Sequence, residues 1–239
     1  MKSIGLNKED WQKMRSGDQS TTQLSERTFN LIFGGSLVWG FLLTMLIVLL
    51  LQNPVMNMMH RQADSYRYII IGVLIGYIIL CAVGSSLMRA ETLGKNIAGY
   101  HLIVLPISIV LSISLAPFLT YEPTLVTSAL LLTLITTGIM IAASMLFPQF
   151  FAGIGRTLGI SLICALIVDL VAFLFFGKYL TFIDYIIAGI MALYIGFDWG
   201  RASTCYRTAQ NALIVAASLY LDIVNLFIRI LSIISRRKD

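Results

Sequence analysis

Apolar residues occur along this chain in long continuous runs that are bounded by charged residues, prolines and glycines. The runs lie near residues 32–51, 68–88, 97–119, 124–146, 152–176, 182–200 and 209–234. A bilayer core about 30 Å thick is crossed by roughly 20 apolar helical residues. Because the runs do not alternate apolar with polar residues, they do not match the strands of a membrane barrel. The pattern therefore predicts an all-α membrane protein with seven transmembrane helices.

The composition agrees with a membrane location for the whole chain. Of the 239 residues, 58% are hydrophobic and 12% are charged, which excludes an ordinary water-soluble domain. We expect a polar cytoplasmic segment over residues 1–29, a transmembrane domain over 30–235 and a basic tail over 236–239. The first segment mixes acidic with basic residues, unlike a cleaved signal peptide. The three cysteines are odd in number and do not indicate a disulfide framework.

Lysine and arginine residues near the ends of the runs predict the orientation, because they are retained on the cytoplasmic side. With the N-terminus inside, the outer loops hold only Arg61, Arg67 and Lys178. The inner segments hold the larger group, Lys2, Lys8, Lys13, Arg15, Arg27, Arg89, Lys95, Arg156, Arg201 and Arg207. We therefore expect a cytoplasmic N-terminus. The basic tail would then face outward after seven crossings, so a six-span or re-entrant arrangement of the last segment stays open.

Two pairs of glycines stand four residues apart within the runs. They are Gly72 with Gly76 in the second run and Gly155 with Gly159 in the fifth. This spacing lets two membrane helices approach closely. We expect helix packing at both places.

Three acidic residues lie well inside the predicted spans, namely Asp169, Asp198 and Asp222. A charge at the bilayer centre costs roughly 2.5 to 3.5 kcal/mol, so such residues normally face the bundle interior and serve ion or proton movement. If the last hairpin turns near residue 210, Asp198 and Asp222 each lie about 12 residues from the turn, or about 18 Å along a helix. The two side chains are therefore expected to meet.

Each acid of this pair has a polar neighbour on its own helix face. Tyr194 precedes Asp198 by four residues, and Asn225 follows Asp222 by three. Two carboxyl groups in contact inside a low-dielectric site cannot both ionise cheaply, so one is expected to keep a proton. Carboxylate oxygens are also ligands that Ca²⁺ prefers, and protons would compete with the metal. The pair is predicted to be a shared-proton latch or a calcium site, unless each acid only holds the bundle together.

Three other charged residues carry weaker predictions. Asp169 has no paired acid in its own span, so a structural role and a functional role are equally open. Arg89, at the inner end of the second span, is either a counter-ion of the acidic pair or a membrane anchor. Arg229 lies two turns beyond Asp222 and is expected to extend outward to the membrane surface.

Three stretches of the sequence resemble the Bax inhibitor-1 family, also called the transmembrane Bax inhibitor motif proteins. Residues 218–227, Ser-Leu-Tyr-Leu-Asp-Ile-Val-Asn-Leu-Phe, resemble the last-span signature of that family. Residues 188–198 are similar to its sixth span, and residues 114–121 are similar to the end of its third. The resemblance covers about residues 30–235.

This resemblance implies a seven-helix bundle with the last helix central, and a cation leak gated by an aspartate pair. By position in the motifs, Asp198 and Asp222 match the two gating aspartates. Arg89 falls where the family often places an arginine that contacts the pair. The implied function is a pH-sensitive calcium leak channel or transporter.

Two other functions remain open from the sequence. One is a membrane-embedded interaction protein that modulates stress or cell-death pathways without conducting ions, and the other is a proton-coupled transporter. An enzyme is not expected, because His60 and His101 stand in no protease-like or metal-like spacing. The expected partners are the lipid bilayer, calcium ions and protons, with no nucleic acid and no cofactor besides the transported or bound Ca²⁺. We expect a bacterial-type cell membrane as the location.

Overall fold

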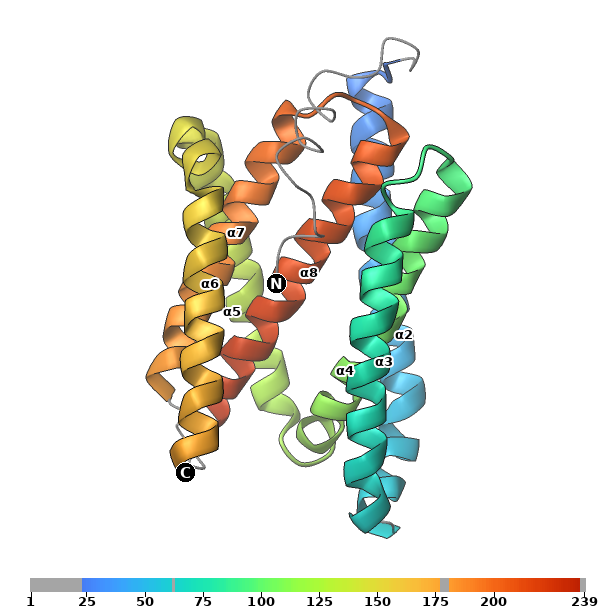
Figure 1. The fold of residues 1–239 in the computed structure, drawn as a ribbon, viewed down its shortest axis with the longest axis vertical. Coiled ribbons are helices and arrows are strands. Elements are labelled where there is room, and N and C mark those ends of the chain that lie inside the picture. The colour runs from blue at the N-terminus through green and yellow to red at the C-terminus, as the bar shows by residue number, and fades with distance from the viewer. Residues whose placement is uncertain (1–22, 62, 177–180, 237–239) are drawn as a thin grey trace. The chain divides into compact units, whose positions relative to one another are not determined.

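The chain is described here by a computed structural model covering residues 23–61, 63–176 and 181–236, and every regular element in these ranges is a helix (Figure 1). The helices are α2 (Glu26–Arg61), α3 (Ala63–Leu87), α4 (Leu93–Tyr121), α5 (Pro123–Leu146), α6 (Pro148–Phe176), α7 (Thr181–Thr204) and α8 (Ala209–Ser235). All seven are long and apolar enough to cross a membrane. The predicted fold class and the seven predicted spans are therefore confirmed. Most of the predicted N-terminal segment and residues 237–239 of the tail lie outside the described residues.

The helix ends are set by polar residues and prolines. Ser25 accepts a hydrogen bond from the backbone N–H of Thr28 at 3.1 Å and so caps the start of α2. Thr208 does the same for the N–H of Asn211 at 3.1 Å, at the start of α8. Helices α5 and α6 each begin at a proline, a residue suited to the first helical position because its missing N–H would be unpaired there anyway.

The helices pack into two compact units, and α8 contributes to both. The amino-terminal unit includes α2, α3, α4 and residues 207–217. The carboxyl-terminal unit includes Thr127–Tyr206 and the part of α8 that begins at Ser218. Of the apolar window of α8, 72% is buried, the largest share among the described helices. An interior helix is thus indicated, while its central place in the bundle stays a prediction.

In the amino-terminal unit, α3 and α4 approach closely at a pair of glycines. A Cβ atom on Gly84 would lie 2.8 Å from the carbonyl oxygen of Gly99, and one on Gly99 would lie 2.6 Å from that of Gly84. Among the described residues, no atom outside the adjoining part of α3 lies within 4 Å of a Cβ added at Gly72 or Gly76. The prediction of close packing at Gly72 and Gly76 was therefore wrong, because the face of α3 that meets α4 carries Gly84 instead.

In the carboxyl-terminal unit, glycines of α6 and α7 make room for aromatic rings of the opposite helix. A Cβ on Gly155 would lie 2.4 Å from the ring of Phe197, and one on Gly196 would lie 2.3 Å from the ring of Phe151. The predicted close packing at Gly155 is confirmed. This interlocking fixes α7 against α6 next to the position of Asp198.

The last hairpin turns earlier than predicted. Helix α7 ends at Thr204 and α8 begins at Ala209, so the turn lies near residues 206–207 and not near 210. Asp198 is therefore six residues before the end of α7, and Asp222 is 13 residues after the start of α8. The expected equal distances from the turn were wrong, because residues 201–204 continue the helix, although the two side chains still meet. Since α8 is a continuous helix of 27 residues, about 40 Å long, a full crossing is favoured over a re-entrant segment.

Candidate functional site

Asp198 of α7 and Asp222 of α8 form a buried acidic pair in the carboxyl-terminal unit. Asp198 is 1% exposed and Asp222 is 8% exposed. Their side chains are in hydrogen-bonding contact with each other. The Oδ2 atoms of both residues have no hydrogen-bond partner among the described residues. Because an ionised carboxylate can only accept hydrogen bonds, a bond between the two groups needs a proton on one of them.

Arg201 is the cation at this pair. Its guanidinium Nη1 lies 2.7 Å from Oδ1 of Asp198, and its side chain is 10% exposed. The guanidinium also lies 4.8 Å from the ring centroid of Phe197, within the range of a cation–π contact. From the sequence, Arg201 is predicted only to be one of the cytoplasmic charges that set the orientation. Its spacing of three residues from Asp198 on one helix face was the signal that could have identified it.

The site therefore contains two acids and one base. With both carboxyl groups ionised, Asp198, Asp222 and Arg201 together carry a charge of −1, from two negative groups and one positive group. One added proton brings the site to neutrality. Charge balance in a buried site thus agrees with the single proton that the contact between the carboxyl groups requires.

The predicted neighbours of the pair lie nearby without bonding to it. Tyr194 is buried, close enough to Asp198 and Asp222 for electrostatic interaction, and its hydroxyl lies 3.4 Å from where a Cβ of Gly159 would be. In the described part of the chain, neither Tyr194 nor Asn225 has a hydrogen bond to either acid. Their supporting roles stay predictions.

Arg89 lies in the amino-terminal unit, in the turn that follows α3. Its predicted role as a counter-ion of the acidic pair stays a prediction. Within the unit that holds the pair, that position is taken by Arg201.

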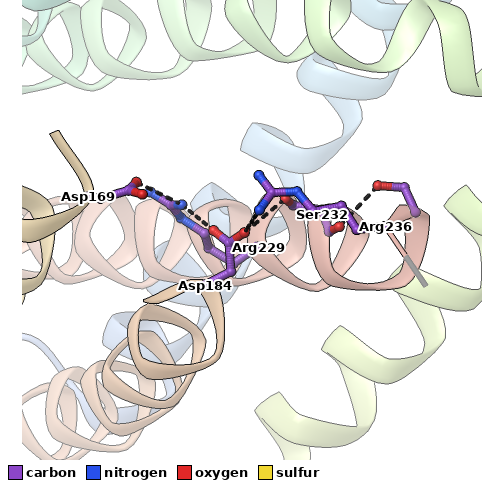
Figure 2. Close-up of polar contacts among 6 residues, drawn as sticks. Asp169, Asp184, Arg229, Ser232 and Arg236 are labelled. Atoms are coloured by element: carbon purple, nitrogen blue, oxygen red, sulfur yellow. Dashed lines mark hydrogen bonds and ion pairs between the residues drawn. The ribbon is translucent and has the colours of Figure 1, made fainter. Parts of the chain in front are cut away.

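A second group of charges, which we name the α8 charge cluster, comprises Asp169, Asp184, Arg229, Ser232 and Arg236 (Figure 2). Asp184, whose side chain is 3% exposed, is its centre. One carboxylate oxygen accepts a hydrogen bond from Arg229 at 2.6 Å. The other accepts one from Ser232 at 3.3 Å and forms an ion pair with Arg236 at 2.9 Å. Arg229 also lies 3.8 Å from Asp169 of α6. The cluster thus joins α6, α7 and α8.

This cluster corrects the prediction for Arg229 and adds a partner for Asp169. Arg229 does not extend outward alone, because it makes ion pairs with acids of two other helices. Asp169 does have a charged partner, which lies 60 residues away in sequence and could not be found by a search along its own span. Asp184 was missed because it lies close to the start of its run, where an acid is ordinary.

The acidic pair and the α8 charge cluster lie at different levels of the same helices. Asp184 and Asp198 are 14 residues apart on α7, which is about 21 Å along the helix. Asp222 and Arg229 are seven residues apart on α8, or about 10 Å on one face. The carboxyl-terminal unit therefore holds two separate layers of charge.

The residues at the pair do not form a complete calcium site by themselves. No group of three or more His, Cys, Asp or Glu side chains suited to a metal occurs among the described residues. Ca²⁺ takes six to eight oxygen ligands, and two carboxylates supply at most four. Arg201 already occupies one of these oxygens. The donor set suits a partly hydrated passing ion better than a resident one.

Comparison with known proteins identifies the family. The searches of curated proteins and of solved structures give no match. A family model described as "Inhibitor of apoptosis-promoting Bax1" matches residues 22–239, which is nearly the whole chain. Together with the seven membrane-spanning helices, this match shows that the chain is a multi-pass membrane protein that belongs to the Bax inhibitor-1 family.

Proposed function

We propose that this protein is a pH-sensitive calcium leak channel or transporter without enzymatic activity, and that Asp198 and Asp222 are its proton-responsive gate. The observation that carries the proposal is the buried contact between the two carboxyl groups, with the Arg201 guanidinium beside them. Intramembrane acids that face one another in a bundle mark ion or proton pathways by default. The proposal includes a cytoplasmic N-terminus in a bacterial-type cell membrane.

Proton uptake and cation binding exclude each other at such a pair. With one proton bound, the site is neutral and the hydrogen bond holds α7 to α8. When the proton leaves, the site carries −1 and two facing carboxylates, which repel each other and attract a cation. Because Ca²⁺ then competes with the proton for the same oxygens, calcium binding is expected to weaken as the pH falls.

The test is calcium flux into liposomes that contain the purified protein and a calcium dye. Wild type is expected to leak at a rate that changes with pH, whereas Asp198→Asn and Asp222→Asn, which remove the shared ionisation, are expected to lose this pH dependence. Glu91→Gln, at an exposed acid outside the spans, is the control and should behave like wild type. An unchanged pH response in both aspartate variants would rule out the assigned gate.

The family description supports a second candidate function. Its wording, inhibitor of apoptosis-promoting Bax1, agrees with a membrane-embedded interaction protein that modulates cell-death pathways without conducting ions. The same flux measurement separates the two candidates. Purified protein that conducts no calcium at any pH would favour the interaction role over the leak.

A further inference from the structure

Polar residues form a single line along the part of α8 in the carboxyl-terminal unit. The line consists of Ser218, Asp222, Asn225, Arg229 and Ser232, at spacings of four, three, four and three residues. These spacings put all five on one helix face, and the residues between them are hydrophobic. Such a line in a membrane helix has to face protein or water, because lipid satisfies none of its polar groups.

Two polar atoms in the first half of this line lack hydrogen-bond partners among the described residues. They are the Ser218 hydroxyl and Oδ2 of Asp222, both in buried side chains. Buried polar groups are satisfied by protein, by ordered water or by an ion. The first half of the line therefore has unused capacity for water or a cation.

At Arg229 the line changes in character. Asp184 and Asp169 hold the guanidinium at 2.6 Å and 3.8 Å, and Arg236 supplies a second positive charge to Asp184 at 2.9 Å (Figure 2). Two acids and two bases give this layer a net charge of zero. The layer at Asp198 and Asp222 carries −1 when ionised. A cation that is attracted to the first layer therefore finds no net attraction at the second.

We propose that Arg229 is a barrier to cations along the polar face of α8, in addition to the gate at Asp198 and Asp222. Its tethered positive charge lies between Asp169 and Asp184, where a passing cation would have to bind. This inference rests on the proposed leak function for its role in transport. The barrier itself is a property of the charge cluster. Replacing Arg229 by glutamine leaves Asp169, Asp184 and Arg236, with a net charge of −1, and frees Asp169 from its ion partner.

The first experiment measures cation entry without relying on conductance. In a background with the native cysteines Cys81, Cys164 and Cys205 replaced by serine, Asn225→Cys places a thiol on the line between the two layers. The protein is held in nanodiscs, and a positively charged thiol reagent is added to both faces. Arg229→Gln should raise the labelling rate by about tenfold, the change produced by about 1.4 kcal/mol of barrier. Arg229→Lys keeps the tethered charge and should label at the original rate.

A second variant makes the sign of the effect testable. Asp169→Asn keeps the guanidinium and removes an acid, so the layer becomes +1 and labelling by the cationic reagent should fall. Faster labelling in Asp169→Asn would overturn the barrier. So would an unchanged labelling rate in Arg229→Gln that retains wild-type helicity and elutes as a single species.

Calcium flux separates this inference from the proposed function. Arg229→Gln in liposomes should leak faster than wild type and should keep its pH response, because Asp198 and Asp222 are intact. If wild type does not leak while labelling of the thiol introduced by Asn225→Cys still depends on Arg229, the leak proposal fails and the barrier stands. If instead wild type leaks with a pH response while Arg229→Gln shows no faster leak and no faster thiol labelling than wild type, only the barrier proposal fails.

Discussion

Neutralising Arg201 should move the pH at which calcium leak responds, and the contact distance sets the size of the effect. Nη1 of Arg201 lies 2.7 Å from Oδ1 of Asp198, and the two side chains are 10% and 1% exposed. With charge centres about 4 Å apart and an effective dielectric constant of about 20, the attraction is about 4 kcal/mol. This attraction favours the ionised form of the acidic pair over its protonated form.

The direction follows from the charge of the site. Without Arg201, the ionised pair would carry −2 in place of −1, so it holds its proton more strongly and releases it only at higher pH. In Arg201→Gln, the midpoint of the leak against pH should therefore rise. Arg201→Lys should stay close to wild type. A midpoint that is unchanged or lower in a folded Arg201→Gln protein would refute this account of the site.

Two further predictions concern stability and are measured by thermal unfolding in detergent. Gly155→Ala puts a methyl group 2.4 Å from the Phe197 ring and should destabilise the protein by about 1 to 3 kcal/mol. Gly153→Ala, at a position with no packed neighbour within 4 Å among the described residues, is the control and should not destabilise it. Equal melting temperatures of the two variants would contradict the packing argument. Asn96→Ala removes a buried amide that donates to three carbonyls at the end of α3 and in the turn that follows it. This change should cost about 1 to 3 kcal/mol of stability. The exposed Asn53→Ala is its control, and a similar loss in both would show that the amide has no special role.

The spans could be predicted from the sequence because they depend on run length alone. A bilayer requires about 20 apolar residues per crossing, and each predicted run overlaps one observed helix. The contact between Asp198 and Asp222 could also be predicted, since a short hairpin brings the adjoining helices together. The exact turn could not. The polar residues from Arg201 to Thr204 look like a loop, yet they stay helical, and there the Arg201 side chain reaches Asp198.

The α8 charge cluster could not be predicted from local patterns. Arg229 and Arg236 lie 45 and 52 residues from Asp184 in the sequence, and no periodicity links them to it. The contacts exist because three helices pack together. The pattern within a single apolar run does not tell which other helices it packs against. The glycine pairs show the same limit, because a spacing of four residues marks a possible contact face without telling which face another helix covers.

The division of α8 between the two compact units has a consequence for biosynthesis. Chains are made from the N-terminus, so both units still lack a segment when the ribosome has completed α7. At that stage Asp169 and Asp184 lack the arginines of the final helix with which they form ion pairs. In a chain that stops before Ala209, both units would be incomplete. Quality control would then act on a product in which neither unit is complete, and not on one with a single complete unit.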